Sequence, residues 1–133
     1  MIGWCGGAAG IGLARLEMLD LLGEEGIAEI EASTKATIRH IGSSGHHLCC
    51  GEAGRIIFLV NAARKLNRPD LLQSAVQATE KMLDFYEQNG YWKLQSMAAR
   101  SIVPGLTDGV AGIGLSLLTL IDPSKTSQLL TLS

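Results

Sequence analysis

The sequence contains no run of lysine and arginine residues and no long apolar stretch. Among its 133 residues, 11 are Lys or Arg and 13 are Asp or Glu, and these charges are interspersed, so no segment is suited to follow a phosphate backbone or an anionic membrane. The longest nearly apolar segment, Val110 to Ile121, is well short of a membrane span. The chain also does not open with a basic segment followed by an apolar one. We therefore expect a cytoplasmic protein with no nucleic-acid partner and no membrane span.

Cysteine is scarce as well. The chain has three cysteines, an odd number that suits a reducing compartment better than a disulfide framework. Cys49 and Cys50 are neighbours, and a disulfide between neighbours is strained and rare. A free cysteine is often only a buried part of the core, so these thiols are either core residues or metal or redox groups.

The glycines, in contrast, are numerous and show that the chain contains a repeat. With 47% hydrophobic residues, the chain is long enough for one ordinary domain. Three segments share one pattern, in which two glycines three residues apart precede a run of small and aliphatic residues: WCGGAAGIGLARL (Trp4–Leu16), LCCGEAGRIIFLV (Leu48–Val60) and LTDGVAGIGLSLL (Leu106–Leu118). Each copy predicts a helix that is buried nearly all round.

More amphipathic segments lie between these copies. In the clearest, Pro69 suits a first helical position and Gly90 a C-terminal cap. A weaker one runs from Ile27 to Ile41, after a linker at residues 22–27. The predicted buried face of the clearer helix consists of Leu72, Val76, Met82, Leu83 and Tyr86. Alternating buried and amphipathic helices are typical of stacked helical hairpins, so we predict an all-α fold without strands.

The repeat also predicts where the cysteines lie. Superposing the copies places Cys5 and Cys49 at one repeat position, with Cys50 directly after Cys49 and with Thr107 and Asp108 in the third copy. Equivalent positions at the starts of neighbouring buried helices point to one shared region, so the three thiols can meet.

Three converging thiolates form a soft site that selects Zn²⁺ and leaves a fourth position for water or substrate, as catalytic zinc sites do. His46 and His47 are the nearest candidates for a fourth protein ligand, which would indicate a closed structural site instead. The cysteine spacing matches no standard C-x-x-C pattern. The residues alone therefore leave a zinc site and a role in the core both open.

Three segments resemble, in the same order, motifs of the cyclase domain of the lanthionine synthetases, the lanthionine synthetase C-like family: WCGGAAGIGLARL, HLCCGEAGR and PGLTDGVAGIGLSLLTLIDP. The Cys-Cys-Gly form is similar to the class II bifunctional enzymes. The resemblance implies stacked hairpins closed into an α/α toroid around a zinc ion, with Cys5, Cys49 and Cys50 as its ligands. It also implies zinc-dependent thioether cyclisation in lantibiotic (lanthipeptide) biosynthesis, in which a cysteine thiol of a dehydrated precursor peptide adds to a dehydroalanine or dehydrobutyrine.

The resemblance further implies residues that these 133 positions do not include. In the family, a proton-transfer histidine and an arginine lie upstream of the Trp-Cys motif, whereas four residues precede Cys5 here. We therefore interpret residues 1–133 as the C-terminal portion of a cyclase domain, with the remainder of the synthetase as a partner. His47 lies in the family's segment before Cys-Cys-Gly and is our candidate catalytic residue, although an exposed loop histidine or one that supports the zinc ligands would fit equally.

Two points stay open at this stage. The alternative function is a non-catalytic α-helical repeat protein, or a degenerate remnant, that binds zinc or peptide without turnover, so enzymatic activity is undecided. Arg55, inside an otherwise apolar helix, either pairs with a carboxylate or faces the centre of the ring.

Overall fold

The computed structural model describes residues 1–94, 102–126 and 130, and helices form most of that part of the chain. In order, they are α1 (Ala8–Glu17), α2 (Leu19–Ile38), α3 (Glu52–Lys65), α4 (Pro69–Asn89), α5 (Val110–Ile121) and the single turn α6 (Pro123–Thr126). No strand occurs within the described residues. The predicted all-α fold is therefore confirmed.

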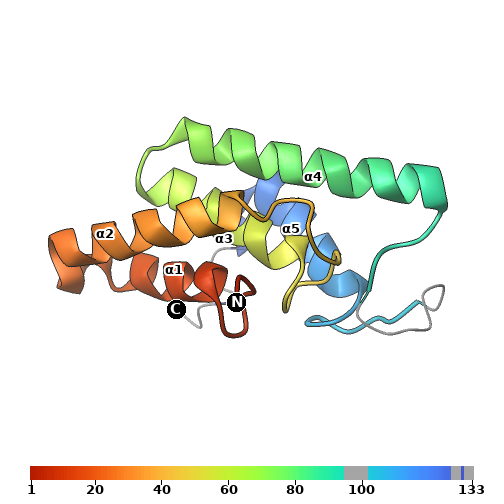
Figure 1. Ribbon diagram of the computed structural model, residues 1–133, viewed down its shortest axis with the longest axis horizontal. Helices are drawn as coiled ribbons and strands as arrows, with labels where there is room; N and C mark the ends of the chain where they lie inside the picture. The colour runs from red at the N-terminus through yellow and green to blue at the C-terminus, as the bar shows by residue number, and fades with distance from the viewer. Residues whose placement is uncertain (95–101, 127–129, 131–133) are drawn as a thin grey trace.

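The helices form hairpins that pack side by side. Helix α1 packs against α2, and α3 packs against α4. Helix α3 also contacts both α1 and α5, so the three copies of the repeat lie next to one another with α3 in the middle (Figure 1). The stacking of the hairpins agrees with the sequence, whereas their closure into a toroid remains a prediction.

The middle helix is the most deeply buried. Every residue of α3 from Glu52 to Val60 is buried, because α1, α4 and α5 all pack against it. Helices α1 and α5 each lie on one side of this arrangement and expose apolar side chains, with Ile11 50% and Leu118 58% accessible. The prediction of a helix buried nearly all round therefore holds fully only for α3.

Helix α4 begins and ends as predicted but presents a different face to the core. Pro69 is its first residue, and Gly90 ends it in the left-handed conformation, with φ of 75°. The predicted face was wrong in part, because four of its five members, Leu72, Val76, Leu83 and Tyr86, are 37–41% exposed. The buried positions are instead Leu71, Ala75, Ala78, Thr79 and Met82. Small side chains on this side allow α4 to lie close to α3, which an assignment based on the largest apolar residues misses.

The predicted linker at residues 22–27 is not a separate loop. These residues lie inside α2, and only Gly23 leaves the helical conformation, with φ of 56° and ψ of −134°. Met18 separates α1 from α2, and the kink at Gly23 falls inside the predicted linker. Glycine adopts positive φ without steric cost, so a single residue kinks the chain without a longer loop.

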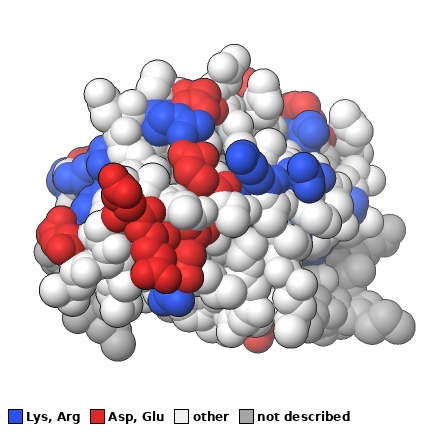
Figure 2. Space-filling model, turned by 60° about the vertical axis from the view of Figure 1, so that its left-hand side comes forward, with Lys and Arg blue, Asp and Glu red and all other residues white. Residues whose placement is uncertain are grey.

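The surface agrees with the interspersed charges of the sequence. Figure 2 shows lysine and arginine side chains set among aspartate and glutamate side chains on one face. None of the helices in the described part of the chain combines the length and the apolar character that crossing a membrane requires.

Candidate metal centre

The helices of the three repeat copies, α1, α3 and α5, begin in the same way. Each has an extended glycine as its N-cap: Gly7, Gly51 and Gly109. The glycine three positions later lies against a backbone carbonyl of the preceding loop. A Cβ at Gly54 would lie 2.3 Å from the oxygen of Leu48, and one at Gly112 would lie 2.2 Å from the oxygen of Leu106. Both distances are far below van der Waals contact, so the paired glycines bring each loop onto the first turn of its own helix.

Backbone hydrogen bonds join the three loops to one another. The amides of Trp4 and Cys5 both donate to the carbonyl oxygen of Cys49, at 2.8 and 3.2 Å. The amide of Cys49 donates in turn to the carbonyl oxygen of Thr107, at 2.9 Å. Cys49 therefore lies between the other two copies of the repeat and is held by its main chain on both sides.

This arrangement brings the three thiols together. The Sγ atoms of Cys5 and Cys50 are 3.3 Å apart, and those of Cys49 and Cys50 are 3.7 Å apart. All three lie within 4.8 Å of one another and form no disulfide. Tetrahedral zinc with Zn–S bonds of ~2.3 Å requires sulfurs that are about 3.8 Å apart. The thiols could therefore hold a metal ion with only small shifts, while their role as ligands stays a prediction.

Because the thiols contact one another, the pKa of Cys5 is lowered and those of Cys49 and Cys50 are raised. Hydrogen bonds from Cys49 and then Cys50 lower the pKa of Cys5, so the first thiolate forms there. Hydrogen bonding to Cys5 and burial raise the pKa of Cys49 to about 12, and the same two causes raise the pKa of Cys50. The cluster thus accommodates one negative charge and opposes the next two. A divalent cation would remove this opposition, since a coordinating thiol loses its proton.

His46 has a structural role. Its Nδ1 accepts a hydrogen bond from the amide of Lys93 at 3.1 Å, and its own amide donates to the carbonyl oxygen of Lys93 at 2.7 Å. Its ring packs edge-on against Phe85 and Trp92. Burial, reinforced by the positive charge of Lys93, lowers the pKa of His46 to about 4. The side chain therefore ties the loop before α3 to the segment after α4.

His47 lies nearer to the thiols but is not one of their group. Its side chain is buried, and its Nδ1 accepts a long hydrogen bond of 3.5 Å from the amide of Cys50. The same nitrogen is 4.0 Å from Oδ1 of Asp108. Burial lowers the pKa of His47, and Asp108 partly opposes this effect. Within the described residues, the group that could share a metal consists of the three cysteines without a histidine.

Two further residues near the site had no assigned role in the sequence. Asp108 stands at the repeat position of Cys50. Its charge slightly opposes the lowering of the Cys5 pKa by the other two thiols, and adds slightly to the raising of the Cys50 pKa by Cys5 and burial. Glu52 forms a buried ion pair with Arg55 at 2.7 Å, which decides between the two expectations for Arg55. The sequence could have pointed to Glu52, because it is a charged residue at a repeat position where the first copy has Ala8 and the third has Val110.

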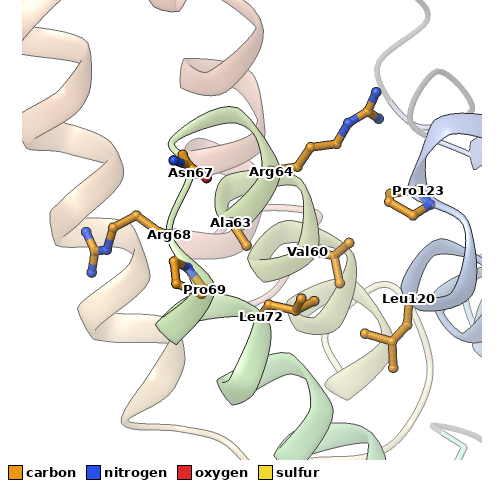
Figure 3. A pocket seen from close by; sticks show the side chains of 9 residues that line it. All are labelled: Val60, Ala63, Arg64, Asn67, Arg68, Pro69, Leu72, Leu120 and Pro123. Atoms are coloured by element: carbon orange, nitrogen blue, oxygen red, sulfur yellow. The ribbon is translucent and has the colours of Figure 1, made fainter.

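A groove elsewhere on the molecule is remote from this chemistry. It has a volume of about 360 Å³ and lies at the other end of α3, where Val60 and Ala63 face Leu72 of α4 and Leu120 of α5 (Figure 3). Its lining contains none of the cysteines or histidines. Its size therefore gives no reason to move the candidate centre away from the thiols.

Comparison with known proteins now decides the family. The model of the lanthionine synthetase C-like proteins matches residues 2–131, which is nearly the entire chain. The chain belongs to this family. No curated protein matches the sequence closely enough to count as a relative. Membership supports a function of the lanthionine synthetase type. Cys5, Cys49 and Cys50 form a group that could hold a metal ion.

Proposed function

We propose that this protein provides the zinc-binding, thiol-activating part of a lanthionine cyclase. The observation that carries the proposal is the convergence of Cys5, Cys49 and Cys50 within 4.8 Å of one another. Three thiolate ligands and an open fourth position suit a catalytic zinc site. When bound, zinc would keep a substrate cysteine as thiolate at neutral pH, where a free thiol of pKa ~8.5 is mostly protonated.

The reaction that fits this site is addition of a thiol to a dehydroamino acid. The peptide's sulfur forms a bond to the β-carbon of dehydroalanine or dehydrobutyrine, the carbon–carbon double bond becomes single, and a proton is added at the α-carbon. No atom is lost, so the peptide keeps its mass. The precursor peptide must therefore supply both the cysteine and the dehydrated residue.

The protein's own residues prepare the nucleophile. The backbone bonds from Trp4 and Cys5 to Cys49 hold the first and second copies of the repeat together, which helps to keep the three thiols close to one another. Cys5 and Cys50 are exposed, which leaves the cluster open to a peptide from solvent. A preorganised set of ligands loses less conformational freedom on binding.

Protonation of the α-carbon is the second requirement, and within residues 1–133 His47 is the candidate nearest to the thiols. A positioned general acid contributes about 10²–10⁴-fold to such a step. His47 is buried, with Asp108 beside its Nδ1, so its access to a peptide is restricted. We propose that the remainder of a larger synthetase supplies the family's proton-transfer histidine, that residues 1–133 form the C-terminal portion of a cyclase domain, and that the protein acts in the cytoplasm.

Zinc-dependent capture of a peptide thiol tests the first half of this proposal. The zinc-loaded protein is mixed with a cysteine-containing precursor peptide, and protection of the peptide thiol from alkylation is measured by mass. We expect protection that requires zinc and is lost in Cys50→Ala, while Thr107→Ala in the third copy keeps it. Protection that is independent of zinc, or unchanged in Cys50→Ala, would refute the proposal.

Ring closure tests the second half. With a dehydrated precursor, closed rings are counted as cysteines that no longer react with an alkylating reagent. We expect the isolated 133 residues to give at most a small excess over zinc-free buffer, with mixed stereochemistry, because the burial of His47 restricts its access to the peptide. Fast and stereochemically uniform closure would contradict this expectation, and its loss in His47→Asn would then assign the proton transfer to His47.

A further inference from the structure

A buried ion pair lies at the start of α3, directly after the neighbouring cysteines. Glu52 is 2% and Arg55 is 4% accessible. Nη1 of Arg55 donates to Oε1 of Glu52 at 2.7 Å. This pair is outside the thiol cluster, and the chemistry proposed above does not use it.

Packing alone does not explain the pair. The equivalent positions are Ala8 and Ile11 in the first copy, and Val110 and Ile113 in the third. Those helices begin with the same glycine geometry, so apolar residues are sufficient for the fold at these positions. A buried ion pair is often no more stabilising than the apolar residues that could replace it. The pair in α3 therefore indicates a function other than stabilising the helix.

Both members of the pair reach the same turn of the chain. Oε1 of Glu52 accepts hydrogen bonds from the amide of Gly42 at 3.0 Å and from the hydroxyl of Ser44 at 3.4 Å. Nη1 of Arg55 donates to the carbonyl oxygen of His40 at 2.5 Å. The pair therefore holds residues 40–44, called here the 40–44 turn, against the first turn of α3.

This turn leads directly into the metal-site loop. The amide of Glu52 donates to the carbonyl oxygen of Gly45 at 2.8 Å, and the amide of Ala53 donates to that of His46 at 3.2 Å. The chain between these anchors, residues 47–51, contains both neighbouring cysteines. Its two ends are thus fixed to the same helical turn, one by backbone bonds and one by covalent continuity.

We infer that Glu52 and Arg55 are positioning residues, which hold the 40–44 turn on α3 so that Cys49 and Cys50 face Cys5. The first and third copies lack the pair and also lack neighbouring cysteines. The inference rests on the proposed metal site for its effect on zinc, but the contacts that carry it involve none of the thiols.

Exchanging the pair for the residues of the third copy tests the inference. The double variant Glu52→Val with Arg55→Ile should unfold cooperatively like the original protein, because Val110 and Ile113 occupy the same positions in α5. Its zinc affinity, measured by competition with a chromophoric chelator, should fall about 10- to 100-fold, as is typical when groups that support ligands are removed. An unchanged affinity, or loss of the cooperative transition, would overturn the inference, the latter because it would assign the pair to stability instead.

Single substitutions separate the hydrogen bonds from the charge. Glu52→Gln keeps an acceptor for Gly42 and Ser44, so it should retain most of the zinc affinity that Glu52→Ala loses. Arg68→Ala, which removes a half-buried arginine paired with Asp70 and Glu31, is the matched control and should leave the affinity unchanged. Equal zinc affinities of Glu52→Gln and Glu52→Ala would contradict the assigned contacts.

Amide hydrogen exchange of the metal-free protein keeps this test independent of the proposed function. The Gly42 amide should exchange faster in the double variant than in the original protein, because its acceptor is gone. If the original protein bound no zinc, the proposed function would fail while the exchange data still decided the positioning. An unchanged rate at Gly42 would overturn the inference whether or not zinc binds.

Discussion

The starts of α3 and α5 have the same backbone and different chemistry. In both, an extended glycine precedes the helix, and the glycine three residues later lies against a carbonyl oxygen of its own loop. The two positions before the first glycine are Cys49 and Cys50 in one copy and Thr107 and Asp108 in the other. The glycines thus build the helix start in both copies, whereas the two residues before them set which side chains the start presents: two thiols in α3, and a hydroxyl and a carboxylate in α5.

The largest expected effect comes from breaking the shared geometry. Gly112→Ala would place a Cβ 2.2 Å from the oxygen of Leu106 and 2.7 Å from Cβ of Leu48, so the protein should lose about 3 kcal/mol or more of unfolding free energy. Denaturant titration followed by circular dichroism measures the change.

The control lies two residues further along the same helix. No atom lies within 4 Å of a Cβ built at Gly114, so Gly114→Ala should be neutral or more stable by about 0.5–1 kcal/mol through a lower entropy of the unfolded chain. Equal stabilities of the two variants would show that close backbone approach is not what the repeat glycines provide.

The next effect concerns the residues that differ between the two helix starts. Cys5→Ser or Cys50→Ser should weaken zinc binding by more than about 100-fold, because each removes one of three thiolate donors. Thr107→Ser, at the matching position of the third copy, should leave the affinity within a factor of about two, since the backbone oxygen that accepts from the Cys49 amide is kept. Competitive titration with a zinc indicator measures all three. Full zinc affinity in either cysteine variant would remove that cysteine from the site.

A smaller effect on stability is expected at His46, which ties the loop before α3 to the segment between α4 and α5. Its pKa is about 4 in the folded protein against 6.5 in the unfolded chain, so the unfolded state binds the proton first as the pH falls. Stability should therefore decrease from about pH 6.5 to pH 4, with His46 contributing about 2–3 kcal/mol of the loss. His46→Asn keeps an acceptor for the amide of Lys93 but does not titrate. Unfolding free energies at several pH values should show a shallower slope for this variant, and an identical slope would contradict the role of burial.

Local patterns in the sequence predict much of the fold. The paired glycines predict the starts of α1, α3 and α5, and Pro69 and Gly90 mark the two ends of α4. The meeting of the thiols also follows from the repeat, because equivalent positions in neighbouring copies lie close together. The buried face of α4 was missed because close packing uses Ala75 and Ala78, which contribute little to a pattern of large apolar residues.

The support of the site could not be predicted in the same way. His46 pairs with Lys93, which is 47 positions away, and the partners of Glu52 lie in a turn with no regular pattern. Such contacts depend on how the loops close over α3 rather than on local propensity. Glu52 and Arg55 stand at positions that are apolar in the other two copies, which marks the second copy as different. The sequence does not specify which donor or acceptor each of these side chains contacts.

The most direct test of the account is X-ray absorption at the zinc edge of the protein loaded with one equivalent of metal. Because the first two copies bring three thiols together, we predict that zinc has three sulfur neighbours at ~2.3 Å and a single lighter donor at the open position. The same measurement on Cys5→Ser should show one sulfur fewer. Two sulfurs with two nitrogens in the original protein would contradict the account, because the histidines would then bind the metal and the two helix starts would not share it.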